Sequence, residues 1–331
     1  MGHDHRMFIA ADIGGTKARF GLYDPMADVR SPARTATLAT AAAADPGDLV
    51  AEFAAHDDFT GVALAVAGAV VDGRARGSNL PWELDAAALR DRFQRPVQLM
   101  NDLEAIATFV PHAAASELEV LQPGVPVAGG PMGVIAPGTG LGEALLFADA
   151  TGTYRSHPSE AGHLDFAPNN GRQDAWLAFQ RQRHGHVSIE RACSGGTLPA
   201  MYEFMCQQPG IEADPDVAVE LRQADAAAGI TAAALENRCP ASVATLEMFA
   251  DILAAAGGDL ALQIVATGGI VLAGGIPPQI LPALRADRFL HAFRHKGRFA
   301  HLTERTPVSV LINDSAGLTG AAMAHAAASA G

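Results

Sequence analysis

The chain has 331 residues and a mass of 34.2 kDa, of which 49% are apolar and 18% are charged residues. This length and composition exclude a disordered chain and predict two domains or one large α/β domain. The formal net charge of −13 argues against a nucleic-acid surface, because binding to the phosphate backbone relies on clustered Lys and Arg.

The three cysteines, Cys193, Cys206 and Cys239, are odd in number and lie far apart. This pattern predicts neither a disulfide framework nor a CxxC metal site. We therefore expect the protein to reside in a reducing cytoplasm.

No apolar run reaches the roughly 18 uninterrupted residues that a membrane helix needs, so no membrane association is expected. The first residues, Met1 to Arg6, lack the apolar core of a signal peptide. Two histidines on a free tail make a weak metal site, so we expect His3 and His5 to belong to a disordered leader.

The first half of the chain predicts alternating strands and helices. Two short strands around Gly-Gly-Thr predict an N-terminal β-hairpin, and a run of small and β-branched residues predicts a buried strand. A helix, a brief strand and a second helix should follow. The predicted elements are strands at Met7–Asp12, Ala18–Asp24, Val62–Ala67 and Val97–Met100, and helices at Leu84–Phe93 and Leu103–Phe109.

A second β-rich block begins near Leu118 and repeats this layout. Strand Met132–Ala136, the glycine turn Pro137–Gly142 and strand Glu143–Ala148 follow in the same order as the N-terminal hairpin, which suggests two related halves. Beyond this block the pattern is mostly helical, with two late strands. The predicted helices are Asp174–Arg183, Ser188–Arg191, Leu198–Gln207, Asp216–Ala227, Ser242–Val265, one opening at Pro277, and Gly317–Ala328; the strands are Ile270–Ala273 and Val308–Ile312.

No low-complexity linker separates the predicted domains, so the boundary should lie in a turn, which we place near Pro111. The expected small α/β domain comprises residues 7–110 with the C-terminal helix, 315–330. Residues 111–314 form the expected large α/β domain.

The first motif is Asp12-Ile13-Gly14-Gly15-Thr16-Lys17, in the predicted hairpin. Glycine lets main-chain N–H groups approach phosphate oxygens, Thr16 offers a hydroxyl, and Asp12 is suited to hold hydrated Mg²⁺. The alternative is a glycine turn that merely reverses the chain.

The second glycine turn contains Gly138 and Thr139, and leads into a strand rather than a helix. It therefore fits neither a Walker A loop nor a dinucleotide fingerprint. Two Gly-Thr turns on two hairpins favour a nucleotide triphosphate gripped from two sides.

Polar residues at the end of a strand are where α/β folds keep their chemistry, and Asn101-Asp102 occupies such a position. A carboxylate can accept the proton of a hydroxyl that attacks a phosphoryl group, while an amide orients the alcohol. The alternative is that Asp102 caps the following helix.

A third group comprises Glu160, His163 and Glu190, whose side chains could form hydrogen bonds with sugar hydroxyls. Zinc binding by His163 is not expected without a cysteine cluster, although a core histidine remains an alternative. The pairs Gly195-Gly196 and Gly274-Gly275 could admit a flat adenine, or could be ordinary turn glycines.

In this order and spacing, the segments together resemble the bacterial glucokinase family over essentially the whole chain. The segments are ADIGGTKAR, LMNDLEAIA, APGTGLGEALL, EAGHLDFAP, SIERACSG, VLAGGI, KGRF and INDSAGLTGAA. The resemblance implies the two-domain actin-like fold of the hexokinase, Hsp70 and actin superfamily, with the active site in the interdomain cleft.

The resemblance also implies roles for these residues. Asp102 would be the general base toward the sugar 6-hydroxyl, and the phosphates of ATP·Mg²⁺ would lie along the glycine turns. A homodimer is also implied. The implied glucose-binding residues are Asn101, Glu160, His163 and Glu190, and the residues implied to lie along the phosphates are Gly14, Gly15, Thr16, Gly138 and Thr139. Asp12, Gly274 and Gly275, singled out above from their own motifs, complete the predicted nucleotide-binding set.

The chain departs from relatives of this family in identifiable places. It lacks the cysteine-rich zinc motif of the repressor-type sugar kinases, and no helix-turn-helix precedes Phe8, which argues against a DNA-binding regulator. Ala161 replaces the first glycine of the usual EGGH segment, and CSGGT replaces a Leu-Ser-Gly-Pro run near the adenosine. Kinases for mannose, fructose or glucosamine, a non-catalytic sugar sensor, and another phosphoryl donor remain alternatives.

Overall fold

The computed structural model describes residues 7–76, 80–221 and 225–330. The fold divides into two compact units, which are described separately: unit 1 is Met1–Ala113 with Asn313–Gly331, and unit 2 is Ala114–Ile312. The sequence placed the divisions at 110/111 and 314/315. The predicted leader with His3 and His5 lies outside the described residues.

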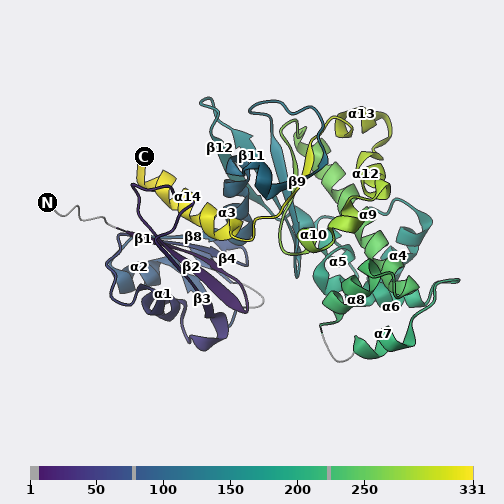
Figure 1. Ribbon diagram of the computed structural model, residues 1–331, viewed down its shortest axis with the longest axis horizontal. Coiled ribbons are helices and arrows are strands. Elements are labelled where there is room, and N and C mark those ends of the chain that lie inside the picture. The colour runs from purple at the N-terminus through teal and green to yellow at the C-terminus, as the bar shows by residue number, and fades with distance from the viewer. Residues whose placement is uncertain (1–6, 77–79, 222–224, 331) are drawn as a thin grey trace. The chain divides into compact units, whose positions relative to one another are not determined.

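Unit 1 is built on a five-stranded sheet in the order β3-β2-β1-β4-β8 (Figure 1). Strands β1 to β3 are antiparallel neighbours, whereas β4 and β8 run parallel to β1. The carboxyl ends of β1, β4 and β8 therefore share one edge of the sheet. The strands are β1 (Phe8–Ile13), β2 (Lys17–Tyr23), β3 (Arg34–Ala39), β4 (Val62–Val66) and β8 (Val97–Asn101).

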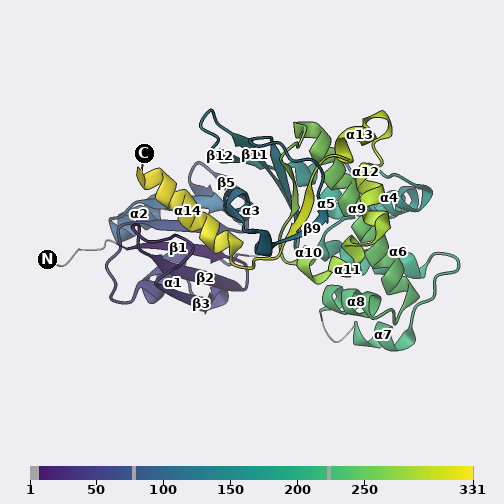
Figure 2. The ribbon, with the colours of Figure 1, turned by 45° about the horizontal axis from the view of Figure 1, so that its top comes forward.

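Helices cover both faces of this sheet because alternate residues of its strands are apolar on both sides. From β1, Phe8 and Ala10 pack in a cluster with Leu318, on the side of α3 (Asp102–Phe109) and α14 (Ala316–Ala330). Figure 2 shows α14 lying along unit 1. The opposite face packs against α1 (Pro46–Ala54) and α2 (Ala86–Phe93).

Several elements of unit 1 were not predicted. Strand β3 and helix α1 fall in a stretch that was left without a predicted element. Asp45-Pro46 is nevertheless typical of a helix start, and the Asp45 side chain does accept a hydrogen bond from the Gly47 N–H. The predicted helix Leu84–Phe93 begins two residues later, after a short strand. A small three-stranded sheet comprises β5 (Val70–Val71), β6 (Arg74–Ala75) and β7 (Leu84–Asp85).

Unit 2 contains a six-stranded sheet in the order β12-β11-β10-β13-β14-β9. Its first five strands repeat the pattern of unit 1: two antiparallel pairs, then two parallel ones. The internal repetition predicted from the two hairpins is confirmed at the level of strand order. The strands are β9 (Leu118–Gln122), β10 (Met132–Pro137), β11 (Leu141–Ala148), β12 (Tyr154–Ser159), β13 (Gly269–Leu272) and β14 (Val308–Leu311).

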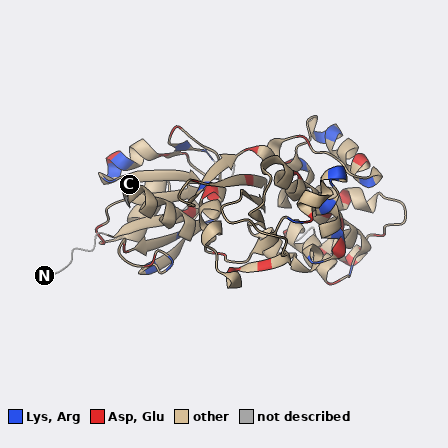
Figure 3. Cartoon of the chain, turned by 90° about the horizontal axis from the view of Figure 1, so that it is seen from above, with Lys and Arg blue, Asp and Glu red and all other residues tan. Residues whose placement is uncertain are grey.

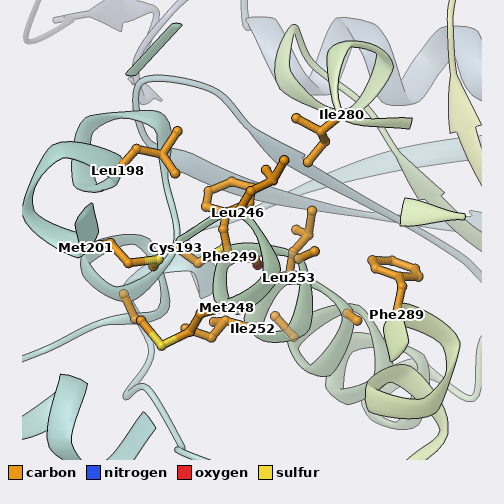
Figure 4. Close-up of a cluster of buried hydrophobic side chains, with 14 of the residues drawn as sticks. Cys193, Leu198, Met201, Leu246, Met248, Phe249, Ile252, Leu253, Ile280 and Phe289 are labelled. Carbon is orange, nitrogen blue, oxygen red and sulfur yellow. The ribbon is translucent and has the colours of Figure 1, made fainter. Parts of the chain in front are cut away.

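The core of unit 2 surrounds α9 (Pro240–Ile264). Buried residues of α9, such as Phe249 and Leu253, pack against Leu198, Met201 and other apolar side chains (Figure 4). Among described helices, α9 alone is long and apolar enough to cross a membrane, but 83% of its most apolar stretch is buried in the fold. It is therefore a core helix, stabilised by removal of apolar surface from water.

The remaining helices of unit 2 are mostly short. The predicted helix Asp216–Ala227 is wrong as a single element: α7 ends at Glu220 and α8 begins at Ala226 after its own cap, Asp225. Residues 222–224 lie outside the described part. The helices are α4 (Gly171–His184), α5 (Ile189–Ala192), α6 (Leu198–Cys206), α7 (Pro215–Glu220), α8 (Ala226–Leu235), α10 (Ile276–Gln279), α11 (Leu281–Leu284), α12 (Asp287–Arg294) and α13 (Ala300–Thr303).

Candidate active site

In unit 1, the first glycine turn, Gly14–Thr16, joins β1 to β2. Neither Gly14 nor Gly15 adopts the left-handed backbone region, so the turn itself does not require glycine. Among the described residues, no group accepts a hydrogen bond from the N–H of Gly15 or Thr16, and Thr16 is exposed. Free N–H groups on a loop without side-chain bulk suit an anion better than a simple chain reversal does.

Asp12 lies near the carboxyl end of β1, between Arg19 on β2 and Ala65 on β4 in the sheet register. Burial raises the pKa of the Asp12 carboxyl, and the positive charge of Arg19 partly opposes this. Gly317 of α14 leaves room for the carboxylate, since a Cβ there would lie 2.8 Å from Asp12 Oδ2. No hydrogen bond to this carboxylate occurs within the described residues, so its oxygens are available to a ligand.

Asn101 ends β8 and is the N-cap of α3. Its Oδ1 accepts from the N–H groups of Leu103 and Glu104 at 2.8 and 3.3 Å, and its Nδ2 donates to the Gly68 carbonyl at 2.9 Å. The alternative that Asp102 is the cap is wrong, because Asn101 fills that position. Because Oδ1 and one amide hydrogen already form these bonds, the second amide N–H of Asn101 can donate to a substrate.

Asp102 is the first residue of α3 and is half-buried. Its Oδ1 shares the Leu103 N–H at 2.8 Å, while Oδ2 receives no hydrogen bond from other described residues. Burial raises the pKa of Asp102 to about 6, helped by the negative charge of Asp12 and opposed by the backbone N–H groups. The side chain is thus ionised near neutral pH but is a stronger base than an ordinary Asp.

In unit 2, three glycine segments converge around the second turn. The N–H of Gly195 donates to the Gly138 carbonyl at 2.8 Å, and the N–H of Gly196 donates to the Thr139 carbonyl at 3.2 Å. A Cβ on Gly195 would lie 2.7 Å from the Gly138 oxygen, so the close approach requires glycine. Gly195-Gly196, which the sequence analysis assigned to adenine or to a simple turn, therefore supports the loop that carries Thr139. The Thr139 side chain is exposed.

Gly274 and Gly275 follow β13, the parallel neighbour of β10, and so reach the same edge of the sheet as Pro137. Gly274 has a φ of 83°, and a Cβ there would lie 3.1 Å from the Pro137 carbonyl oxygen. Gly275 has open space around the position of its missing Cβ. The predicted nucleotide residues of unit 2 therefore do lie together.

Glu190, at the start of α5, is tied to the second glycine turn. Its Oε2 accepts from the Leu141 N–H at 3.0 Å, and a Cβ on Gly140 would overlap that oxygen. Its side chain is 31% exposed. One carboxylate oxygen is thus fixed by the backbone, and Oε1 remains directed toward His163, 4.0 Å from Nδ1.

His163 joins Glu190 to Glu160, whose Oε2 lies 3.8 Å from His163 Nε2. The segment is held in place because the Leu164 carbonyl accepts from the Ile189 N–H and the Phe166 N–H donates to the Val187 carbonyl, around an isolated antiparallel bridge between Asp165 and Ser188. The side chains of Glu160 and His163 are 71% and 59% exposed. The three predicted sugar-binding residues of unit 2 therefore form one polar group, in which Glu160 and His163 are exposed and Glu190 is partly buried.

Gly162 has a packing role that the sequence did not reveal: a Cβ there would overlap the Leu141 carbonyl oxygen. Ala161, which replaces a glycine of the family segment, is accommodated as the first residue of a short 3₁₀ helix, Ala161–His163. The sequence also missed the pair of His186 and Asp165, 2.6 Å apart, beside the sugar-binding group. Only the antiparallel pairing brings these two residues together.

An apolar cavity of about 80 Å³ lies elsewhere in unit 2, lined by residues that include Val125, Val127, Val265 and Leu302. It contains none of the predicted site residues.

Two repeated α/β units, each with a glycine turn inside its β-hairpin and carboxylates at strand ends, define an enzyme of the actin-like ATPase fold. The particular family follows from comparison: the Glucokinase family model matches residues 9–328, and the chain belongs to the glucokinase family.

Curated relatives agree with this family over most of the chain. A glucokinase of Nostoc punctiforme is 36% identical over 277 residues, covering 80% of this chain and 81% of the relative. A glucokinase of Synechocystis sp. is 31% identical, covering 96% and 98%. One of Nitrobacter hamburgensis is 34% identical, covering 95% of each.

Solved structures show the same fold. The crystal structure of a glucokinase from an Antarctic psychrotroph has a TM-score of 0.82 and 30% identity, covering 96% of this chain and 98% of that one. A ROK family glucokinase from Streptomyces griseus, in complex with glucose and AMPPNP, has a TM-score of 0.65 and 22% identity, covering 96% and 98%. The second likeness concerns the fold alone.

Proposed function

We propose that this protein transfers the γ-phosphoryl group of ATP to the 6-hydroxyl of D-glucose, the first step of glycolysis. Family membership supports ATP-dependent glucose phosphorylation. The observation that carries the residue assignment is Asp102, a half-buried carboxylate with a pKa near 6 and one oxygen without a protein donor.

Asp102 acts as the general base. Oδ2 accepts the proton of the 6-hydroxyl as its oxygen attacks the γ-phosphorus, and the bond from that phosphorus to the ADP oxygen breaks. A base with a pKa near 6 is ionised at neutral pH and still drives proton transfer better than one near 4. The remaining N–H of Asn101 is positioned to orient a sugar hydroxyl.

Glu160, His163 and Glu190 bind the sugar. Glu190 Oε1 and the imidazole present a fixed acceptor and an adaptable ring nitrogen, and a hexose offers several hydroxyls that pair with both. The hydrogen bond from the Leu141 N–H already holds the Glu190 side chain in place. Binding a sugar therefore costs little further conformational entropy at this residue.

The two Gly-Thr turns hold the phosphates through N–H groups and the hydroxyls of Thr16 and Thr139. Asp12 fits Mg²⁺, because this ion is usually held by one or two carboxylates together with substrate phosphates, and within the described residues the Asp12 oxygens receive no hydrogen bond. No group of three or more metal-ligating side chains occurs among the described residues. When bound, Mg²⁺ would neutralise charge on the phosphate oxygens.

The test is a coupled assay of ADP release with ATP·Mg²⁺ and glucose, beside wells of mannose, fructose and glucosamine and a blank without sugar. Glucose should give the highest kcat/KM. Activity only with another hexose would change the substrate and keep the mechanism, whereas sugar binding without ADP release would establish the sensor alternative instead.

We also propose a cytoplasmic homodimer that binds neither nucleic acid nor membrane. The family resemblance supports the dimer, and the net charge of −13 opposes nucleic-acid binding. Figure 3 shows Lys and Arg on separate helices and loops rather than along one continuous stripe. Sedimentation velocity at micromolar concentration tests the dimer directly, since a monomer at all concentrations contradicts it.

A further inference from the structure

The first glycine turn is held by a residue that no motif contains. Thr40 follows the edge strand β3 and is fully buried. Its hydroxyl donates to the Gly14 carbonyl at 2.8 Å, and its N–H donates to the Thr16 carbonyl at 3.0 Å. One residue, distant in sequence, therefore fixes two carbonyl groups of a loop of three residues.

These two bonds determine which way the loop presents its donors. In a planar trans peptide the C=O and the following N–H point in opposite directions. When Thr40 holds the Gly14 carbonyl, the Gly15 N–H is turned away from Thr40, and it is one of the N–H groups without an acceptor among the described residues. The Gly14 and Thr16 carbonyl oxygens, which would repel a phosphate, are held by Thr40.

We propose that Thr40 is a positioning residue for ATP: it holds the Gly14 and Thr16 carbonyls away from the phosphates and leaves the Gly15 N–H turned toward them. This inference rests on the proposed assignment of that loop to the nucleotide. Thr40 does not contact the substrate, and it acts on affinity and on transition-state stabilisation through the loop.

The test uses Thr40→Val, which keeps the size and branching of the side chain and removes only the hydroxyl. The Gly14 carbonyl is then left unpaired, and the loop is free to rotate that peptide. The expected result is an increase of about tenfold in KM for ATP and in Kd for ADP·Mg²⁺, with KM for glucose within about twofold of wild type. Thr40→Ser keeps the hydroxyl and should restore near-normal values.

Thr60 provides a matched control within the same unit. Its hydroxyl and N–H both donate to one carbonyl, that of Met7, at 3.1 and 2.8 Å, at the other end of β1, whereas Thr40 bonds two carbonyls. Thr60→Val should lower Tm by a similar amount and leave KM for ATP unchanged. The proposal is overturned if folded Thr40→Val binds nucleotide as tightly as wild type. It is also overturned if Thr40→Val and Thr60→Val change KM for ATP by the same amount.

If Thr40→Val does not fold, hydrogen exchange on the wild-type enzyme tests whether Thr40 holds the loop. The Thr40 N–H should be protected without nucleotide, while the Gly15 and Thr16 N–H groups should become protected only with ADP·Mg²⁺. A Thr40 N–H that exchanges freely overturns the positioning role. If the loop gains no protection while the enzyme is active, the assignment of the loop to phosphate fails instead, and the proposal fails with it.

Discussion

The charge of Asp12 raises the pKa of Asp102, although 90 residues separate them in sequence. The two side chains lie at the carboxyl ends of β1 and β8, with β4 between those strands. The charge of the carboxylate suited to Mg²⁺ therefore changes the pKa of the carboxylate suited to proton transfer. The two groups are close because the strands that carry them run parallel.

Asp102→Asn should reduce kcat by about 10²- to 10⁴-fold, because the amide cannot accept the proton of the hydroxyl. The fold should remain intact, since Asn101 rather than Asp102 caps α3. Steady-state kinetics and a thermal melt test this, with the exposed Asp91→Asn as control. Near wild-type turnover would remove Asp102 from its role as the base.

The pH profile of kcat/KM should fall as the pH decreases through about 6, where Asp102 becomes protonated. In Asp12→Asn the acidic limb should move to lower pH, because the neighbouring negative charge that raises the pKa of Asp102 is gone. The measurement depends on the shape of the profile and not on the absolute activity of the variant. An unshifted limb would mean that the two carboxylates are not coupled.

Asn101→Ala should lower the free energy of unfolding by about 1 to 2 kcal/mol, through loss of the helix cap. Asn101→Ser keeps a side-chain oxygen that can cap the helix, and it loses the donor to Gly68 without adding a charge, so it should cost less. Urea unfolding of the three proteins checks the order. Equal losses in both variants would show that the cap is not the main contribution of Asn101.

Glu143, which is 2% exposed on β11, should make the protein less stable as the pH rises. Burial raises the pKa of Glu143 to about 7, with a contribution from Asp259, and its Oε2 has no hydrogen-bond partner among the described residues. The folded state therefore keeps a proton that the unfolded state releases above its pKa of 4.5. This stabilisation is complete below 4.5 and is lost as the pH rises through 7.

Glu143→Gln removes this titration. Its free energy of unfolding relative to wild type should rise between pH 4.5 and pH 7.5 by up to about 3 kcal/mol. Denaturant melts at both pH values measure the change, and any constant packing effect of the amide cancels. A difference independent of pH would contradict the protonated state of Glu143.

Gly140→Ala should raise KM for glucose by about tenfold or more, since the new Cβ displaces Glu190 Oε2 from the Leu141 N–H. Gly171, with open space and an ordinary backbone conformation, provides the control Gly171→Ala. Kinetics with varied glucose compare the two variants. An unchanged KM in Gly140→Ala would exclude Glu190 from sugar binding.

Local patterns were enough to predict the two hairpins, most of the strands and the long core helix α9, because each depends on runs of apolar residues and on nearby glycine or proline. The same was true of the two Gly-Thr turns and of Asn101-Asp102, which are contiguous motifs. Strand β3 and helix α1 were missed, although Asp45-Pro46 is a typical sequence signal for the start of a helix.

The sequence by itself determined the family, the glycine turns and the set of polar side chains that can carry the chemistry, because these are matters of residue type and spacing. Only the tertiary structure decided that Asn101 is the cap, that Gly195 supports Gly138, and that Thr40 holds the first turn. The Gly195 and Thr40 contacts depend on how segments distant in sequence approach each other, and the cap depends on the residue at which α3 begins. The pKa of Asp102 depends on burial and on a charge brought near by strand order. Such contacts arise from long-range packing, which local sequence spacing does not specify.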